Sequence, residues 1–467
     1  MIKTNVLLID PPWIIENDRN LWRKVGSCFP SLGLGYVAAV LEKDGHKVRF
    51  LDCTAEKISV NAIEGVLKRY DAPGFVGLTA TTPLVNNARV IAAICKRIYP
   101  EVKVVLGGIH PSFMPDEVLG DGNVDFVVRH EGEITMKELV AGKNPKEILG
   151  LSYKSRGKII HNPERPLIKN LDELPPPAYH LMPMKKYRPA IGNYKRLPAM
   201  SIFATRGCPG KCTFCQPTFG GMMRPRSAKN ILEEIKLLQD NYGIKEISFY
   251  DDTFTVFRNV VKEFCETIIR EKIDLTWSCF TRANFVNEEL LALMKKAGCH
   301  LILFGVESAD EQILKNIRKE ISLDLVVKAV RIARKVGIET RTSFMIGNPG
   351  ETDETIKKSI DFAIRLDPDE VQFNITTVFP GTEMFKWADE NGYITTKDWS
   401  KYNMSDIVWK HPNLSPETMQ KYYRLAHRKF YLRPKVILRR LLKIRTFTQV
   451  KQEIKGGLAV LSYLFKK

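Results

Sequence analysis

The chain has 467 residues, a length that favours about three domains of ~150 residues each. Hydrophobic residues make up 44% and charged residues 27% of the chain, which excludes wholesale disorder and collagen-like repeats. No run of ~18 uncharged apolar residues occurs, so we expect no membrane-spanning helix. The first apolar stretch is too short for a signal peptide. Nine cysteines without a secretion signal indicate the reducing cytoplasm, and metal or redox chemistry rather than a disulfide framework.

The net charge of +18 is unevenly distributed. Residues Arg428–Lys467 hold twelve Lys or Arg and one acid, Glu453, so +11 of the total lies in the last 40 residues. So basic a segment indicates a polyanionic partner, either nucleic acid or an anionic membrane surface.

Residues 1–145 alternate short apolar runs with helical patterns. Such alternation predicts parallel βαβ units, and hence an α/β, doubly wound, Rossmann-like domain with ligand sites at the carboxyl ends of its strands. The expected strands are Val6–Ile9, Val48–Leu51, Phe75–Leu78, Val102–Leu106 and Phe126–Val128, and the expected helices are Leu34–Leu41, Asn86–Ile98 and Met114–Leu119.

Residues 146–195 are rich in proline and show little periodicity, so they predict a linker that begins with a hairpin over 148–160. From 196 to 395 the strand–helix alternation resumes, which predicts a full or partial TIM-type βα barrel with active groups on the loops after the strands. Residues 396–467 are expected to form a helical, basic extension. The expected barrel strands are Ala199–Ala204, Glu246–Tyr250, Leu275–Cys279, His300–Gly305, Arg341–Ile346 and Val371–Phe373.

A cysteine cluster directly follows the first barrel strand. Cys208, Cys212 and Cys215 have the spacing C-x3-C-x2-C, and three thiolates this close can converge on one iron–sulfur centre. A zinc knuckle that lacks its fourth ligand, or three unrelated buried thiols, are the alternatives. The other six cysteines follow no ligand spacing and are expected to be packed thiols.

This cysteine spacing resembles the signature of the radical S-adenosylmethionine (SAM) superfamily. In that superfamily the three cysteines hold a [4Fe–4S] cluster whose fourth iron binds the amino and carboxylate groups of SAM, and an aromatic residue precedes the last cysteine. The resemblance implies that SAM is bound by residues at the ends of several barrel strands. The SAM-binding candidates are Phe214, Asp251, Asp252, Arg282, Glu307, Gly347 and Glu351.

The residues at the strand ends match the motifs of the superfamily at some strands and not at others. Asp251 and Asp252 stand where many relatives carry Gly-Gly-Glu, so their role is open. Arg282 is placed to pair with a carboxylate, or else it makes a structural ion pair. Glu307 matches the acid that receives the ribose hydroxyls. Gly347 resembles the glycine near adenine, whereas a structural role suits Glu351 better.

Two segments of the first domain, 30–46 and 105–111, resemble the cobalamin-binding domain that precedes many radical SAM enzymes. Glycines at strand ends let a backbone approach a bulky nucleotide tail, and threonines offer hydroxyls. The Asp-x-His-x-x-Gly motif is absent, because Asp10 is followed by Pro-Pro, and His110 suits a structural role better than cobalt ligation. A degenerate domain that has lost the cofactor is the alternative. The cobalamin-binding candidates are Asp10, Thr79, Thr81, Thr82, Gly107, Gly108, His110, Glu131 and Gly132.

The resemblance implies an enzyme that cleaves SAM to a 5′-deoxyadenosyl radical at the cluster and transfers a methyl group through cobalamin to an unactivated carbon of a small-molecule or lipid substrate. It does not predict which residue is catalytic. An external electron donor such as flavodoxin or ferredoxin is implied. One alternative is an oxidative cyclase or C–C bond-forming enzyme without methyl transfer. Another is an RNA-modifying, methylthiotransferase-like enzyme, but Cys28, Cys53 and Cys95 have the wrong spacing for its second cluster, so nucleic acid is not the expected partner.

The basic extension supports a last prediction. Residues 431–445 pattern as a cationic amphipathic helix, which suits peripheral contact of a cytoplasmic enzyme with the inner face of an anionic membrane. A terminal helix packed on the barrel with a solvated basic side is the alternative.

Overall fold

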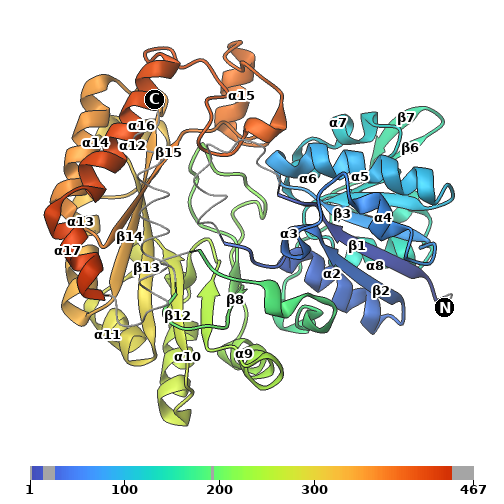
Figure 1. Cartoon of the computed structure of the whole chain (residues 1–467), viewed down its shortest axis with the longest axis horizontal. Coiled ribbons are helices and arrows are strands. Elements are labelled where there is room, and N and C mark those ends of the chain that lie inside the picture. Colours follow the sequence, from blue (N-terminus) through green and yellow to red (C-terminus); the bar gives the residue numbers. More distant parts are fainter. Residues whose placement is uncertain (1–2, 14–26, 191–193, 444–467) are drawn as a thin grey trace.

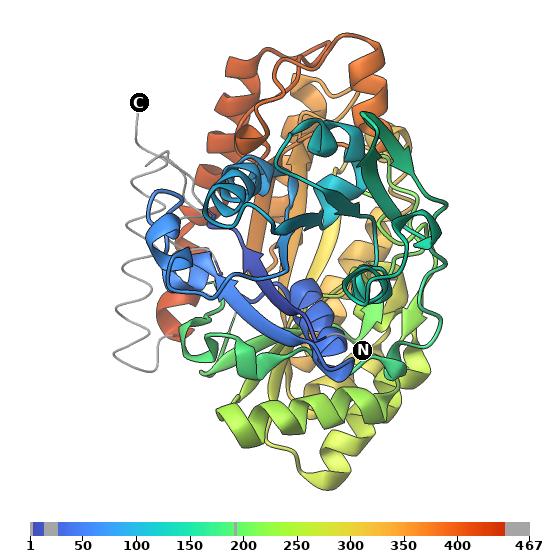
Figure 2. The ribbon, with the colours of Figure 1, turned by 90° about the vertical axis from the view of Figure 1, so that its right-hand side faces the viewer.

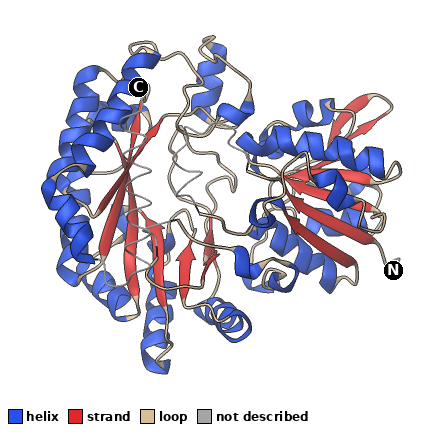
Figure 3. Cartoon of the chain, viewed as in Figure 1, coloured by secondary structure: helices blue, strands red, loops and turns tan. Residues whose placement is uncertain are grey.

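The computed structural model describes residues 3–13, 27–190 and 194–443. Two α/β units make up these residues, one built on a seven-stranded sheet and the other on a six-stranded sheet (Figure 1). Helices lie on the outside of each unit and the strands lie inside (Figure 3). No helix within the described ranges is long and apolar enough to cross a bilayer.

The N-terminal sheet has the order β2-β1-β3-β4-β5-β6-β7. The first five of these strands are parallel, and β6 and β7 are antiparallel. Because chain order reverses between β1 and β3, the carboxyl edge beside them is a topological switch point, where doubly wound sheets bind ligands. The strands are β1 Asn5–Asp10, β2 Lys47–Asp52, β3 Phe75–Thr79, β4 Lys103–Gly107, β5 Phe126–Val128, β6 Leu151–Ser155 and β7 Lys158–His161.

Alternate side chains of these strands enter different cores. Leu8 and Val105 pack with α2 (Leu32–Lys43) and α8 (Glu133–Val140) on one face. Leu7 and Val104 enter the core on the other face, which α4, α5 and α7 cover. Both faces are therefore buried, as expected for a parallel sheet. The remaining helices here are α3 Cys53–Glu56, α4 Ile63–Leu67, α5 Val85–Ile98, α6 Ile109–Phe113 and α7 Pro115–Gly120.

The predicted hairpin is present, but it belongs to the N-terminal sheet. Phe126 of β5 pairs with Tyr153 of β6 in antiparallel register, so the sheet continues past residue 145 into the segment expected as linker. The backbone of the hairpin completes the hydrogen bonding of β5, which would otherwise be an exposed edge. The described residues after β7, 162–190 and 194–198, are irregular apart from short 3₁₀ turns and an isolated antiparallel bridge between Cys28 and Arg188.

The second sheet is parallel throughout, with the order β15-β14-β13-β12-β11-β8. Among the described residues β8 and β15 each pair with one strand, so the barrel is open rather than closed. The fold class predicted from the sequence is confirmed, and the barrel is of the partial type. The strands are β8 Ala199–Ile202, β11 Glu246–Phe249, β12 Thr276–Thr281, β13 Cys299–Glu307, β14 Glu339–Ile346 and β15 Glu370–Ile375.

Helices that follow the strands cover the outside of the barrel (Figure 1). Their ends carry ordinary stop and start signals: the Ser227 side chain accepts a hydrogen bond from the Asn230 N–H at the start of α9, and Gly243 ends that helix in the left-handed conformation. These helices are α9 Ala228–Tyr242, α10 Arg258–Glu271, α11 Glu288–Lys296, α12 Glu311–Asn316, α13 Leu323–Val336 and α14 Asp353–Leu366.

The barrel segment ends with α15 (Glu383–Glu390). The described part of the C-terminal extension begins irregularly and then forms two helices that pack on the barrel, α16 (Pro416–Tyr431) and α17 (Pro434–Lys443). The Tyr431 hydroxyl of α16 donates to the Val371 carbonyl of β15, at an oxygen–oxygen distance of 2.6 Å. The last 24 residues, including the remaining basic and apolar positions of the tail, lie outside the described residues.

Candidate active site between the two sheets

A cavity of about 1410 Å³ lies between the N-terminal sheet and the barrel. The N-terminal unit lies directly against the open side of the barrel (Figures 1 and 2). Residues at the carboxyl ends of strands from both sheets line the cavity, among them Thr79, Gly107, Asp252 and Glu307. Ligand-binding groups of both units therefore converge on one space.

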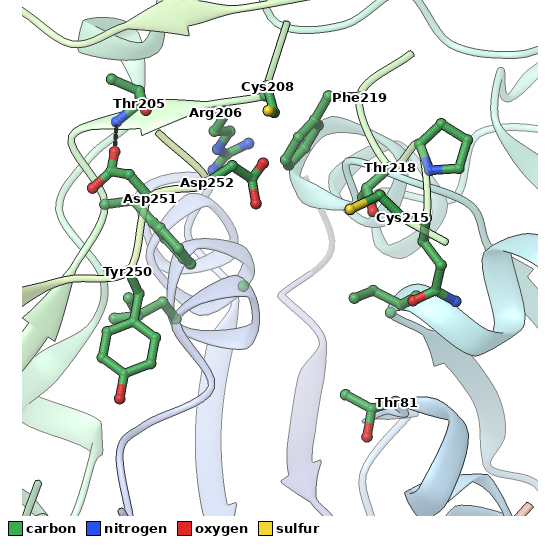
Figure 4. Close-up of a pocket in the computed structure, with 18 of the residues that line it drawn as sticks. Thr81, Thr205, Arg206, Cys208, Cys215, Thr218, Phe219, Tyr250, Asp251 and Asp252 are labelled. Carbon is green, nitrogen blue, oxygen red and sulfur yellow. Dashed lines mark hydrogen bonds between the residues drawn. The ribbon is translucent and has the colours of Figure 1, made fainter. Parts of the chain in front are cut away.

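The cysteine loop enters this cavity from a short hairpin. Strand β9 (Thr205–Arg206) pairs in antiparallel register with β10 (Arg224–Pro225), and residues 207–223 form the loop between them. Gly207 has φ of 100°, and a Cβ there would lie 2.1 Å from the Met222 carbonyl oxygen, so only glycine fits. Asp251 accepts hydrogen bonds from the backbone N–H groups of Ala204 and Thr205, the second drawn in Figure 4.

The three cysteines of the loop are free thiols beside the cavity. Figure 4 shows Cys208 and Cys215 on either side of Phe219. A hydrogen bond from Cys215, together with the nearby cations Lys319 and Arg282, lowers the pKa of Cys212 to about 6 against the opposing effect of burial. Among the described residues no His, Cys, Asp or Glu group could hold a single metal ion. Three cysteines on one loop that also holds glycine and proline instead fit an iron–sulfur cluster, in which each of three irons takes its own cysteine.

Two cationic side chains, Arg282 and Lys319, lie close to the cysteine loop. The Arg282 guanidinium donates to the Lys319 and Glu320 carbonyls, each at 2.9 Å, while a Cβ at Gly210 would lie 2.4 Å from Arg282 Nη1. Lys319 Nζ lies 2.9 Å from Glu307 Oε1. Positive charge of this kind favours thiolates and an anionic cluster in a low-dielectric site.

The SAM-binding candidates are only partly brought together. Arg282 and Glu307 line the cavity next to the cysteine loop, and Glu307 also accepts a hydrogen bond from Ser343 at 3.2 Å. Gly347 and Glu351 do not line it, because the Glu351 carboxylate accepts from the Gly347 and Asn348 N–H groups and closes the turn after β14. The candidates that line the cavity are Phe214, Asp251, Asp252, Arg282 and Glu307.

At its other end the cavity becomes a slot inside the N-terminal unit. Gly77 of β3, Val37 of α2 and Met136 of α8 line this part of the cavity. A Cβ on Gly77 would come within 2.7 Å of a Leu8 methyl group and 3.6 Å of the Met136 methyl, so the glycine keeps the wall flat. An apolar slot that opens at the switch point fits a large, partly apolar ligand such as the nucleotide tail of cobalamin.

Six of the nine cobalamin-binding candidates line the cavity and three do not. His110 is fully buried: its ring packs on Trp399 with centroids 5.0 Å apart, and its Nε2 lies 3.7 Å from Glu117 Oε2. Asp10 lies instead next to Asp52, and burial together with that charge raises the pKa of Asp10. Thr82 is buried at the start of a 3₁₀ turn. The candidates that line the cavity are Thr79, Thr81, Gly107, Gly108, Glu131 and Gly132.

Several residues that line the cavity were not among the predicted site residues. Arg206 and Lys319 are buried or nearly buried cations beside the cysteine loop, and Arg206 stands only two positions before Cys208. This closeness to the cysteine motif was the one feature of the sequence that could have identified Arg206. Val37 lies in segment 30–46, whose resemblance to the cobalamin-binding domain was its only signal. Gly77 belongs to an apolar segment that patterns as ordinary core, so nothing in its spacing marks the slot.

Comparison with known proteins agrees with this geometry. The sequence model of the radical SAM superfamily matches residues 202–363, and that of the B12 binding domain matches residues 19–140. An uncharacterised methyltransferase of Pyrococcus horikoshii is 40% identical, over 97% of this chain and 98% of its own length. The chain belongs to the family of cobalamin-dependent radical SAM methyltransferases.

Two further proteins are similar to this chain. An anaerobic magnesium-protoporphyrin IX monomethyl ester cyclase of Rubrivivax gelatinosus is 29% identical over 83% of this chain and 71% of the cyclase. The radical SAM methyltransferase TsrM of Kitasatospora setae, solved with cobalamin and a [4Fe–4S] cluster bound, has the same fold. Its TM-score is 0.74 at 18% identity, covering 99% of this chain and 100% of TsrM. The cofactors of the family are a [4Fe–4S] cluster, SAM and cobalamin.

Replacing Cys208 by alanine should remove one cluster ligand. After anaerobic reconstitution with iron and sulfide, we expect about four irons per chain in the parent and a loss of most of this iron in the variant. Iron analysis and the visible absorption of the cluster measure the loss. Cys279→Ala is the matched control, because Cys279 is buried in β12 and should keep the full iron content. Equal iron in Cys208→Ala and the parent would contradict the cluster assignment.

Filling the slot should block cobalamin without affecting the cluster. Val37→Phe places a ring in the slot, and we expect hydroxocobalamin to bind about tenfold more weakly while iron content is unchanged. Equilibrium dialysis with absorbance of the bound cobalamin measures this. Val90→Phe, at an exposed position on α5, is the control. Full binding by Val37→Phe would mean that cobalamin lies elsewhere.

Proposed function

We propose that the chain methylates an unactivated carbon of a small-molecule or lipid substrate held in the cavity between the two sheets. The observation that supports this proposal is the continuity of one cavity from the cysteine loop to the slot between β3, α2 and α8. A cavity that joins both cofactor sites allows a substrate to reach both without release. The cluster, SAM and cobalamin supply the radical and methyl-transfer chemistry when they are bound.

The residues of the chain have distinct roles in this proposal. Cys208, Cys212 and Cys215 hold the cluster, and Arg282 and Glu307 orient SAM beside it by charge and by hydrogen bonds. The Glu307 carboxylate faces both Lys319 and Ser343, so its direction is held before a ligand arrives.

The slot residues have a complementary role. Gly107, Gly108 and Thr79 form its mouth, and a Cβ on Gly108 would lie 2.8 Å from Thr79 Oγ1. Close backbone packing there leaves room for a bulky cofactor at the strand ends. The apolar walls on either side exclude water from the reacting groups. An external one-electron donor such as flavodoxin or ferredoxin completes the system.

Transfer of the SAM methyl group to a product tests the proposal against the cyclase alternative. The reconstituted enzyme, loaded with hydroxocobalamin, is incubated with SAM labelled in its methyl group and with a metabolite extract from cells that lack the protein. We expect a labelled product by mass spectrometry, absent with Cys208→Ala. A product that forms without label, with loss of hydrogen, would favour the oxidative cyclase and contradict methyl transfer.

We also propose that the enzyme contacts an anionic membrane through the α17 surface, defined as Ile437, Leu438, Leu441 and Leu442. These four apolar side chains are 45%, 58%, 59% and 75% exposed. Basic residues accompany them on the same helix, which Lys435 and Arg439 tie to Asp367 of the barrel at 2.8 Å each. Apolar side chains framed by cationic ones are the chemistry that an anionic bilayer surface attracts.

Vesicle co-sedimentation tests this contact. We expect the parent to bind vesicles that contain phosphatidylglycerol, and the double variant Leu438→Ser/Leu441→Ser to bind about tenfold more weakly because it loses apolar insertion. The control is Val90→Ser/Leu325→Ser, which changes exposed apolar residues of α5 and α13. Equal binding of both double variants, or equal binding to pure phosphatidylcholine, would contradict the proposal.

A further inference from the structure

A cluster of buried ion pairs joins the two units at the edge of the cavity. Arg206 Nη1 lies 2.6 Å from Glu131 Oε1, and Arg206 Nη2 lies 2.7 Å from Glu133 Oε1. Arg224 Nη1 lies 3.0 Å and 2.9 Å from the two Glu131 oxygens. The four side chains are at most 10% exposed. We call Glu131, Glu133, Arg206 and Arg224 the interdomain clamp.

The clamp connects three separate parts of the chain. Glu131 lies in the turn between β5 and α8, next to Gly132 at the mouth of the slot. Arg206 and Arg224 are paired residues of β9 and β10, the two ends of the cysteine loop. Ile168 of the irregular segment donates its N–H to Glu131 at 2.8 Å and accepts from Arg224 at 2.6 Å. One carboxylate therefore holds both ends of the cysteine loop.

The bonding leaves Glu131 little acceptor capacity for a ligand. Its two oxygens accept from Arg206, from Arg224 and from the Ile168 N–H, which occupies most of the lone pairs of the carboxylate. Burial is outweighed by the hydrogen bonds and charges of Arg224 and Arg206, which lower the pKa of Glu131. Removal of this ionised, buried carboxylate would leave the buried guanidinium charges beside it without their counter-charge.

We propose that Glu131 is a positioning residue that sets the distance between the cysteine loop and the cobalamin slot, and not a contact of cobalamin. The inference rests on the proposed function, because the distance matters only if groups pass between the two cofactor sites. Such transfer needs reacting atoms within about 3–3.5 Å, and a misplacement of about 1 Å can lower a rate by about 100-fold.

A second set of contacts also joins the two units, so the interdomain clamp does not hold them together alone. Trp399 Nε1 donates to Glu117 Oε1 of α7 at 2.8 Å. Gly381 packs on Phe113 of α6, where a Cβ would lie 2.2 Å from the ring. Loss of Glu131 should therefore leave the units associated and change their register at the clamped edge alone.

The variant Glu131→Gln tests the proposal in full-length protein loaded with cluster and cobalamin. We expect unchanged iron and cobalamin contents. The magnetic interaction between the reduced cluster and cob(II)alamin, measured by pulsed electron paramagnetic resonance, should broaden from one narrow distance to a wide distribution. The rate at which labelled methyl passes from SAM to cobalamin should fall about 100-fold, with the KM for SAM changed less than about threefold, because Arg282 and Glu307 are untouched.

The matched control is Glu246→Gln. Glu246 is also a buried carboxylate, bonded to His300 at 2.8 Å and to the Lys195 and Arg196 N–H groups, but it lies at the opposite, amino end of β11. We expect Glu246→Gln to be less stable than the parent. The cluster–cobalamin distance, the methyl-transfer rate and the KM for SAM should all be unchanged. Arg224→Lys, which keeps the charge and loses the two-oxygen contact, should fall between the parent and Glu131→Gln, and it replaces Glu131→Gln if that variant does not fold.

Two results would overturn the proposal. One is a Glu131→Gln enzyme with a narrow distance and the parental rate; the other is loss of cobalamin with the loop unchanged, which would make Glu131 a ligand contact. Amide hydrogen exchange of residues 207–223, measured in protein that carries the cluster but no cobalamin, separates this outcome from failure of the proposed function. The exchange rate of these residues should rise in Glu131→Gln and not in Glu246→Gln, whether or not the chain binds cobalamin.

Discussion

The buried pairing of Glu131 with Arg206 and Arg224 holds the carboxyl ends of the parallel strands of both sheets against one cavity. Each sheet on its own exposes strand ends that can bind one cofactor. Only their fixed placement creates a space that both cofactor sites share. The Trp399–Glu117 contact at another edge adds a second fixed point, and two separated contacts restrict rotation in a way that one cannot.

The same charges that hold the cavity together also determine its chemistry. Around the cysteine loop the cations are already engaged, Lys319 with Glu307 and Arg282 with backbone carbonyls. They need no rearrangement to meet an anionic cluster, so the electrostatic support of the site is organised before binding. The lowered pKa of Cys212 reflects this environment, since the two cations and the Cys215 hydrogen bond favour the thiolate.

Much of the fold could be predicted from the sequence, because parallel strands buried on both faces leave short, continuous apolar runs such as Val6–Ile9 and His300–Gly305. The cysteine loop and the strand ends near Thr79 and Gly107 could be found for the same reason. The burial of His110 agrees with the structural role that its sequence favoured, but its partner Trp399 lies nearly three hundred positions later and could not be predicted. The slot residue Gly77 could not be identified either, since the wall of a binding slot and the wall of a core have the same apolar pattern.

The acids show why residue type at a strand end is an incomplete guide to ligand binding. Glu131, Asp251 and Glu351 all follow strands, where a carboxylate commonly receives a ligand. Yet Glu131 is filled by two arginines, and Asp251 and Glu351 by backbone N–H groups. A carboxylate whose lone pairs are taken by the protein shapes a site without touching what binds there. For Glu131 and Asp251 these partners are distant in sequence, and Glu131, which lines the cavity, is bound by residues at both ends of the loop that carries the cysteines.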